Sequence, residues 1–459
     1  MSTKRDLVEA HAFSRRRLVT AFVSGAPGGR EVEPNRPGRA IIGGVALAIL
    51  LVAGAAIAGV FSPRTQANWR DSGIVIAKES GNNYVVIENG DPLRPTDPVS
   101  ARLIFGTTAE ARSVAQDEIN KVEIGDDIGI FGAPDSLPST GLLVDSGWSA
   151  CMNDHGGAQF RIDSTPATRP APAAAVTVTG SGGRRYLVVS SGNGSGAYRL
   201  DLGAGRTANG ILARLGLASA PSYDAPDEWL NLFPAGPALS EGSFGVSGAG
   251  RPAPYADRLG DASLRIGQLV TYVGKTYVLG SAVPIEVGPF AAAVYAITSG
   301  EAPAEVDAFD ARAEPATDLA VWPAAEPVAL AAVPCAVLDA AEGRAARTLL
   351  ATSPTGEASA LEVGDAIRYS VAPGQGAYVR TAGHGDVSGG QQWVVDSGGT
   401  RYRLGGKGVE TAEQLGYGGY DAPTIPDAWI EQFGCGPELS PQAAMAEPDP
   451  EAATGSCAR

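Results

Sequence analysis

Histidine, methionine and cysteine are scarce in this sequence of 459 residues, which contains three, three and four of them. The histidines are His11, His155 and His384, and no Cys/His spacing typical of a zinc site includes them. No G-x-S-x-G turn supports a serine nucleophile. His155, four positions after Cys151, is interpreted as a loop residue rather than a base. The sequence therefore predicts no metal site and no catalytic residues.

A nucleotide-binding loop is also missing. Gly274-Lys275-Thr276 resembles the end of a phosphate-binding loop, but Leu269 stands where that loop needs its first glycine. The flanking Tyr and Val residues indicate a strand rather than the start of a helix, so we interpret the triplet as a turn. Gly405-Gly406-Lys407-Gly408 is interpreted as another turn, and Asp126-Asp127 as part of a solvated loop. The residues themselves predict no cofactor.

The chain has no surplus of basic residues, and its formal net charge is −15. Residues 1–40 hold eight basic and four acidic side chains, a net charge of +4, which leaves −19 for residues 41–459. An acidic body of this kind argues against sequence-independent binding of nucleic acid, which needs Lys and Arg to neutralise phosphates. The basic tip instead fits the anionic inner surface of a membrane.

One long apolar run is present. Residues 41–60 read IIGGVALAILLVAGAAIAGV, without one polar side chain. As a helix this run spans roughly 30 Å, the thickness of the bilayer core, and predicts a transmembrane helix. Arginines precede it, so the positive-inside rule places residues 1–40 in the cytoplasm and residues 61–459 outside. A cleaved signal peptide ending near Ala58 is the alternative, but the run is longer than the apolar part of such signals.

The N-terminal tip contains the start of a second helix. Thr3 and Asp6 fit a capping pattern, and apolar residues recur from Leu7 to Val23. We interpret the tip as an amphipathic helix on the membrane or on a partner. The alternative is a loosely ordered flank whose arginines only set the topology.

Two long segments of the body are duplicates of each other. Residues 182–200 and 389–404 each read as a β-hairpin that contains Tyr-Arg-Leu. Identities then recur at a constant offset of 200 residues, from Leu215-Gly216 and Leu415-Gly416 to Leu239-Ser240 and Leu439-Ser440. Shorter, more diverged copies follow Gly81 and Gly274. Each unit is too small to bury its own apolar face, so the units must pack against a shared core.

The predicted fold is a single N-terminal transmembrane helix followed by an extracytoplasmic α+β body that is rich in β-structure. Four hairpin-plus-helix repeats surround a central β-rich core. The body covers residues 61–440 and is followed by a C-terminal tail, residues 441–459. The repeats are expected at about 74–106, 182–240, 274–300 and 389–440, and the core at about 107–181 and 301–388.

The four cysteines all follow the predicted span, on the side where disulfides persist. Cys151 and Cys335 fall in the two core segments, one in each half, so we expect them to pair and to staple the core. Cys435 stands where the duplicate segment has Ala235, and Cys457 lies in the tail. We expect these two to pair and to fix the tail to the fourth repeat.

Several of these features together resemble the EccB family of type VII (ESX) secretion systems of Actinobacteria. They are the run from Val8 to Phe22, the single span after it, the four alternating repeats and the cysteine in each core segment. The most family-specific pieces are the repeat endings Phe233-Pro234-Ala235-Gly236-Pro237-Ala238-Leu239 and Gly436-Pro437-Glu438-Leu439. The resemblance covers nearly the whole chain up to about Pro441. Cys435 and Cys457 are not part of the general family pattern.

The resemblance implies a core component of an inner-membrane secretion complex with a periplasmic body. It implies EccC-, EccD- and EccE-like membrane components and a mycosin protease as partners, and assembly of several copies. Members of the family are sometimes described as ATPases. No nucleotide motif exists here to which that activity can be transferred, so ATP as a cofactor rests on the family description only.

Three functions remain open. A structural scaffold of a secretion pore is favoured by the anchor, the duplicated modules and the missing active site. An extracytoplasmic ATP hydrolase rests on the family description. A cell-wall binding protein is the third, because repeated hairpins with Tyr and Trp can recognise glycans.

Overall fold

The computed structural model describes residues 4–24, 37–61, 68–153, 156–340, 344–353 and 367–451. The side chains of residues 24, 37–40 and 54–61 lie outside that description. The chain forms two compact units, Met1–Thr65 and Gln66–Arg459.

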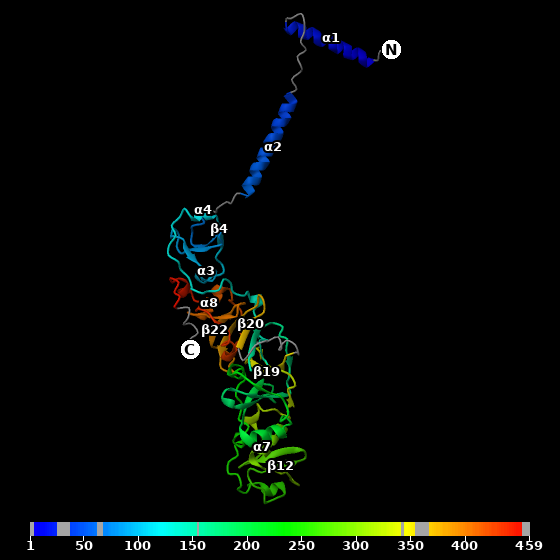
Figure 1. Ribbon diagram of the computed structural model, residues 1–459, viewed down its shortest axis with the longest axis vertical. Helices are drawn as coiled ribbons and strands as arrows, with labels where there is room; N and C mark the ends of the chain where they lie inside the picture. Colours follow the sequence, from blue (N-terminus) through cyan, green and yellow to red (C-terminus); the bar gives the residue numbers. More distant parts are fainter. Residues whose placement is uncertain are drawn as a thin grey trace. The chain divides into compact units, whose positions relative to one another are not determined.

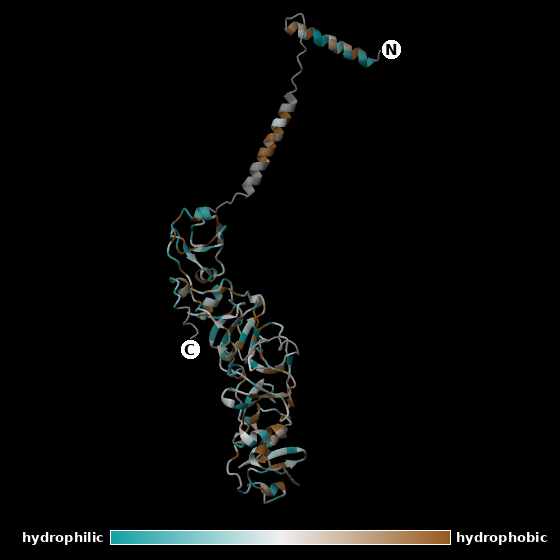
Figure 2. Ribbon diagram, in the orientation of Figure 1, coloured by the Kyte–Doolittle hydropathy of each residue, from teal (hydrophilic) through white to brown (hydrophobic). Residues whose placement is uncertain are grey.

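The first unit consists of two helices, α1 (Lys4–Ser24) and α2 (Pro37–Phe61). The helix expected in the N-terminal tip is present as α1, and large apolar side chains such as Leu7, Leu18 and Phe22 are exposed on it. The described side chains of α2 are mostly hydrophobic (Figure 2). Within the described part of the chain, no helix combines the length and the apolar character that crossing a membrane requires. The span predicted at residues 41–60 is therefore not confirmed and stays a prediction.

The second unit begins with a four-stranded sheet, which we call module 1. Its strand order is β3-β2-β1-β4: three antiparallel strands, then helix α3, then β4 parallel to β1. Helix α3 begins after Asp97, whose carboxylate accepts a hydrogen bond from the backbone N–H of Ser100 at 2.8 Å. The elements are β1 (Gly73–Ala77), β2 (Asn83–Val86), β3 (Arg94–Thr96), α3 (Pro98–Phe105), β4 (Ala111–Val114) and the short α4 (Gln116–Ile119).

Three further sheets, modules 2, 3 and 4, have the same connectivity: an antiparallel meander, a helix, and a strand parallel to the first strand. Module 2 contains β8 (Ala174–Thr179), β9 (Arg185–Ser190), β10 (Ala197–Gly203), α5 (Gly205–Arg214), β11 (Ser222–Asp224) and β17 (Val328–Ala329). Module 3 contains β12 (Leu269–Tyr272), β13 (Lys275–Leu279), β14 (Pro284–Val287), α7 (Pro289–Ser299), β15 (Ala304–Glu305) and β16 (Glu314–Pro315). Module 4 contains β21 (Ala377–Ala382), β22 (Gln391–Val395), β23 (Thr400–Arg403), α8 (Gly408–Leu415), β24 (Thr424–Pro426) and β25 (Gly434–Cys435).

The modules differ from the predicted repeats at their boundaries. Modules 2, 3 and 4 each begin one strand before the predicted hairpin, at β8, β12 and β21. The distinctive identities between the two segments begin only at the hairpin, and the few common residues shared by β8 and β21 did not mark this first strand. The predicted tail also begins too early, because α9 (Pro441–Ala444) packs on α3 and buries Ala444, so the packed body continues past residue 440. Ser440 caps that turn by accepting a hydrogen bond from the N–H of Ala443.

A six-stranded sheet in the order β20-β6-β5-β18-β19-β7 forms the centre of the second unit. All six strands come from the two segments expected to form the core, three from each. β5 and β18 are antiparallel neighbours and join the two halves. The strands are β5 (Ser149–Met152), β6 (Ala158–Ile162), β7 (Arg169–Pro170), β18 (Pro334–Asp339), β19 (Arg347–Thr352) and β20 (Ile367–Val371).

Within the second unit the chain runs out and back. Helix α5 of module 2 packs on α7 of module 3, and after the return through the central sheet, α8 of module 4 packs on α3 of module 1. The backbone N–H of Gly129 donates to the carbonyl of Ala446 at 3.0 Å. The first and last parts of this unit therefore lie side by side, as Figure 1 shows for α3 and α8.

Candidate functional site

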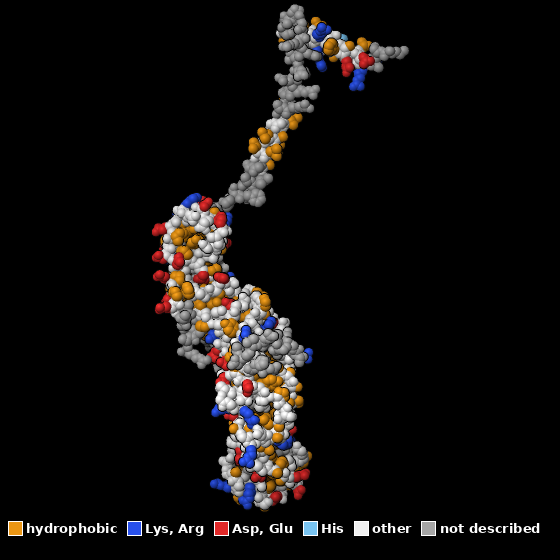
Figure 3. All heavy atoms as spheres, viewed as in Figure 1, with side chains coloured by type: hydrophobic (Ala, Val, Ile, Leu, Met, Phe, Trp, Pro, Cys, Tyr) orange, Lys and Arg blue, Asp and Glu red, His pale blue; other side chains and the backbone are white. Residues whose placement is uncertain are grey.

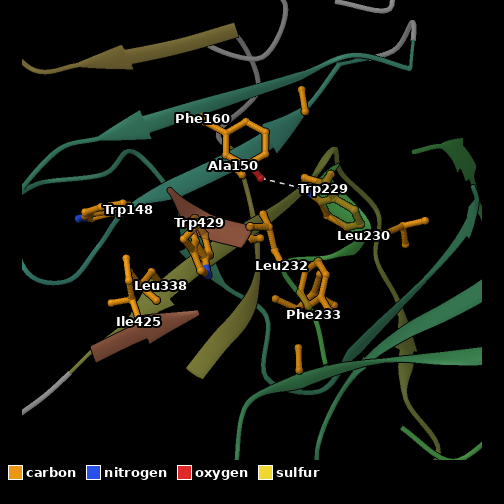
Figure 4. Packing of buried hydrophobic residues seen from close by; sticks show 14 of the residues in the cluster. Trp148, Ala150, Phe160, Trp229, Leu230, Leu232, Phe233, Leu338, Ile425 and Trp429 are labelled. Carbon is orange, nitrogen blue, oxygen red and sulfur yellow. Dashed lines mark hydrogen bonds between the residues drawn. The ribbon is translucent and has the colours of Figure 1, made fainter. Parts of the chain in front are cut away.

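Two tryptophans from the duplicated segments enter the hydrophobic core beneath the central sheet (Figure 4). The short helices α6 (Asp227–Leu230) and η7 (Asp427–Trp429) each begin after a proline and place one tryptophan. The indole of Trp229 donates to the carbonyl of Ala150 at 2.9 Å, and the indole of Trp429 donates to the hydroxyl of Thr348 at 3.1 Å. Both indoles are almost completely buried, so modules 2 and 4 are each anchored to the core by one large side chain.

Thr348 also connects the two halves. Its hydroxyl donates to the carbonyl of Leu232 at 2.6 Å while it accepts from Trp429. The hydroxyl is thus hydrogen-bonded to module 4 and to module 2 at once. Such chains of buried hydrogen bonds favour one specific arrangement of the two modules.

Cys151 and Cys335 form a disulfide, the pairing that the sequence favoured. They lie directly opposite each other on β5 and β18, with their Cα atoms 4.0 Å apart, and are separated by 184 residues in the chain. Cys435, on β25, is disulfide-bonded as well. Its predicted partner Cys457 lies outside the described residues, so that pairing stays a prediction.

Two of the three histidines, His11 and His384, lie within the described residues. His11 lies on α1, and His155 falls outside the described residues. His384 follows β21, and its Nε2 lies 3.0 Å from the carbonyl oxygen of Asn231. Desolvation lowers the pKa of His384 below its ordinary value, so the neutral ring donates to that carbonyl. This side chain connects modules 4 and 2.

Gly274-Lys275-Thr276 is part of a tight turn between β12 and β13, as the sequence predicted. The turn residues Val273 and Gly274 have φ angles of 45° and 74°. No helix follows the triplet, so its backbone N–H groups do not form a phosphate cradle.

A cavity of about 420 Å³ lies beside this turn, between modules 2 and 3. Its lining includes two ion pairs, Lys275 with Glu286 and Arg214 with Glu326, each with an N–O distance of 2.9 Å. Ala292 of α7 also lines it. Arg214, the Lys275–Glu286 pair and Glu326 come from three separate segments of the sequence, so no local motif marked this place.

A hydrogen-bonded pair of side chains that the sequence did not indicate, Asp145 and Tyr420, lies where the segment just before the central strand β5 meets module 4. The hydroxyl of Tyr420 donates to the carboxylate of Asp145 at 2.5 Å. Burial raises the pKa of Asp145, and the nearby charge of Asp421 adds to this, against the effect of the Tyr420 hydrogen bond. Asp145 is therefore a titratable group at a contact between elements far apart in the chain.

Surface charge and metal-ligand geometry limit the chemistry further. Residues 68–135, which include module 1, hold twelve acidic and six basic side chains. On the face shown in Figure 3, acidic side chains gather over this module. Such a surface disfavours nucleic acid. Across the described ranges, no group of three or more His, Cys, Asp or Glu side chains is arranged to hold a metal ion.

Residues 1–452 match the family described as "Type VII secretion system ESX-1, transport TM domain B". The chain belongs to the EccB family. The ESX-3 secretion system ATPase EccB3 of Mycobacterium tuberculosis is 28% identical over 476 residues, covering 89% of this chain and 83% of that protein. The ESX-1 secretion system ATPase EccB1 of Mycolicibacterium smegmatis is 32% identical over 114 residues. That match spans 25% of this chain and only 23% of the length of EccB1.

Solved EccB-containing assemblies share the fold. An intact ESX-5 inner membrane complex contains a chain that matches with a TM-score of 0.61 and 22% identity, over 98% of this chain and 96% of that chain. The EccB3 dimer from the ESX-3 core complex matches with a TM-score of 0.58 and 22% identity, over 82% of this chain and all of that chain. The mixed body of several sheets is thus the EccB fold.

Proposed function

We propose that this protein is a structural, membrane-anchored core component of a type VII (ESX) protein secretion complex, with residues 61–440 as its periplasmic scaffold. The family match over residues 1–452 carries this proposal. The construction of the second unit supports it. A central sheet takes three strands from each half, and two buried tryptophans fix modules 2 and 4 to its core, which suits a body that holds partners at fixed positions.

The proposed topology has residues 1–40 in the cytoplasm, residues 41–60 across the inner membrane and the body in the periplasm. The uninterrupted apolar run and the arginines before it favour this orientation. The Cys151–Cys335 disulfide agrees with it, because disulfides persist in oxidising compartments. Alkaline phosphatase fused after residue 451 should be active in whole cells, and an inactive but stable fusion would contradict the topology.

The proposed partners are EccC-, EccD- and EccE-like membrane components, a mycosin protease, the lipid bilayer and further copies of this chain. The solved ESX-3 relative is a dimer, which supports self-association. We also propose that the four modules arose as repeats of one unit, because all four sheets share a connectivity and two share sequence.

The decisive experiment is the size of the assembly in native membranes. The full-length protein, extracted with mild detergent from its own host, should migrate in native gels as a large complex that contains an EccC-like ATPase. Recovery of free monomer alone, under conditions that preserve other membrane complexes, would contradict the scaffold role.

ATP hydrolysis is a second candidate, because the curated relatives are named ATPases. The lysine of the Gly274-Lys275-Thr276 turn lies beside the carboxylates of Glu286 and Glu326, which repel a polyphosphate. We expect ATP turnover to separate from the full-length protein on further purification. Turnover that stays with the protein and is lost in Lys275→Ala, but not in Lys407→Ala, would establish the hydrolase instead.

A further inference from the structure

The charges in the cavity between modules 2 and 3 balance each other. Lys275 pairs with Glu286, and Arg214 pairs with Glu326, so two cations and two carboxylates share the lining. All four side chains are about half exposed, between 41% and 59%. Exposed ion pairs contribute little to stability, so a ligand with charges of both signs can replace them at little cost. A polyphosphate, by contrast, would be repelled by the two carboxylates of the lining.

The rest of the lining leaves room for small apolar groups. Ala292 and Ala296 lie one turn apart on α7 and line the cavity together with Pro289. Their methyl groups are the shortest apolar side chains that can occupy these positions, and longer ones would reduce the space. The volume of about 420 Å³ falls within the range of small-molecule sites.

The turn beside the cavity has an unfavourable backbone conformation. Val273 is the one non-glycine residue with positive φ in the described part of the chain, and its side chain is 82% exposed. A two-residue turn of this kind favours Asn-Gly, and a β-branched residue there is strained. Conformations of this cost cluster at functional sites. Here the turn brings the chain directly into Lys275, the cavity residue that begins β13.

We propose that this cavity binds a short zwitterionic peptide, with its carboxylate at Lys275 and Arg214 and its ammonium group at Glu286 and Glu326. Small apolar side chains of the peptide contact Ala292 and Ala296. The proposal is independent of the scaffold function, because it rests only on the cavity and its charges.

The test uses the full-length protein in detergent micelles and tri-alanine as the probe, followed by saturation-transfer-difference NMR titration. Tri-alanine should bind, and blocking either its amino end by acetylation or its carboxyl end by amidation should weaken binding about two- to fivefold, since each block removes charged contacts to half-exposed side chains. Binding of only the acetylated form would indicate the C-terminus of a longer chain instead of a free peptide and would overturn the proposal.

Variants locate the site. Ala296→Leu fills the cavity and should abolish binding, and Glu286→Gln should weaken it about two- to fivefold by removing one ammonium partner. Lys407→Gln is the matched control, because it breaks an exposed ion pair of the same length, 2.9 Å to Glu410, in module 4. It should leave binding unchanged. Circular dichroism establishes that each variant is folded.

Three results would overturn the proposal. They are no detectable binding of tri-alanine, binding that survives both Ala296→Leu and Glu286→Gln, and ATP competing with tri-alanine at equal concentration. If Ala296→Leu fails to fold, the charge variant Glu286→Gln alone decides, since it changes no volume.

Discussion

The two places where modules meet in pairs are built from different aromatic residues. Modules 2 and 3 meet in a cluster of rings packed edge to face, with Phe244, Phe290 and Trp322 at centroid distances of 5.5 and 5.6 Å. Modules 1 and 4 meet in a cluster that contains the tyrosines 378, 402 and 417. The hydroxyl of Tyr417 donates to the carbonyl of Pro138 at 2.8 Å.

The difference lies in where the polar tips of the rings reach. Phe244 and Phe290 stabilise the junction of modules 2 and 3 through burial. In the same cluster, Trp322 and Tyr295 donate to the carbonyls of Pro237 and Gly267. In the cluster of modules 1 and 4, Tyr417 donates instead to Pro138, in the segment just before the central strand β5, so this contact depends on the position of a third part of the chain.

The largest expected effect comes from removing the disulfide that joins the two halves of the central sheet. The double variant Cys151→Ala/Cys335→Ala opens a loop of 184 residues and should lower the free energy of unfolding by up to about 5 kcal/mol. Alanine is chosen because Cys335 is fully buried and a serine hydroxyl would lack a partner. Urea unfolding measures the loss, and the wild type treated with reductant should lose at least as much, because reductant also opens the disulfide of Cys435. Equal stability of both forms would contradict the stapling role.

The second-largest effect is expected from truncating the side chain of Phe290 in the aromatic cluster between modules 2 and 3. Phe290 is fully buried between modules 2 and 3, so Phe290→Ala should cost about 3–5 kcal/mol through lost burial and a residual cavity. The measurement is chemical denaturation of the full-length protein in detergent. Val409→Ala, at an exposed position on α8, is the control and should change stability little. A loss below about 1 kcal/mol for Phe290→Ala would show that this junction does not depend on its rings.

Removal of one hydroxyl tests the tyrosine junction. Tyr417→Phe leaves the carbonyl of Pro138 without its partner and should cost about 1 kcal/mol. Tyr198→Phe removes an exposed hydrogen bond to Ser195 and should have a smaller effect. If both variants were equally stable, the polar tips would have no part in this junction.

The smallest effect is a pH dependence near the tyrosine junction. The raised pKa of Asp145 means that its protonated form is favoured in the folded state. Its contribution is thus fully present below the ordinary value of 3.8 and is lost as the pH rises through the folded-state pKa. The stability of the wild type relative to Asp145→Asn should fall as the pH rises above about 4.

Asp163 provides a control of opposite sign. A backbone hydrogen bond from Thr165 and the nearby Arg161 hold the pKa of Asp163 below its usual value. Its contribution is present above 3.8 and is lost as the pH falls through the lower folded-state pKa. Slopes of the same sign for Asp145→Asn and Asp163→Asn would contradict one of the two assignments, and the sign itself would show which.

The parts of the fold that could be predicted have strong local signals. The hairpins are marked by glycine turns and by Tyr-Arg-Leu, and Trp229 and Trp429 are marked by the constant offset between the duplicates. The first strands β8 and β21 could not be found in this way, because AAVTVT and AYVRTA share only common residues and no distinctive motif. The docking of α9 on α3 was missed because no feature of the tail indicates its distant contact surface.

The candidate sites were harder to predict than the fold. Cys151 and Cys335 could be paired because each is the one cysteine of its core segment. Arg214, Lys275 and Glu326 become neighbours only after modules 2 and 3 pack, and Asp145 meets Tyr420 only after the chain has returned. Charges brought together by tertiary packing leave no spacing in the sequence.

The out-and-back course of the chain has a consequence for biogenesis. In the topology proposed above, translocation of residues 61–459 delivers module 1 first, but the partner of α3 is α8, which arrives almost last. β5 likewise waits for β18 before Cys151 can be oxidised against Cys335. Contacts between such remote segments slow folding and leave apolar surface exposed meanwhile. Newly translocated chains should therefore need a holding chaperone until the C-terminal module has crossed.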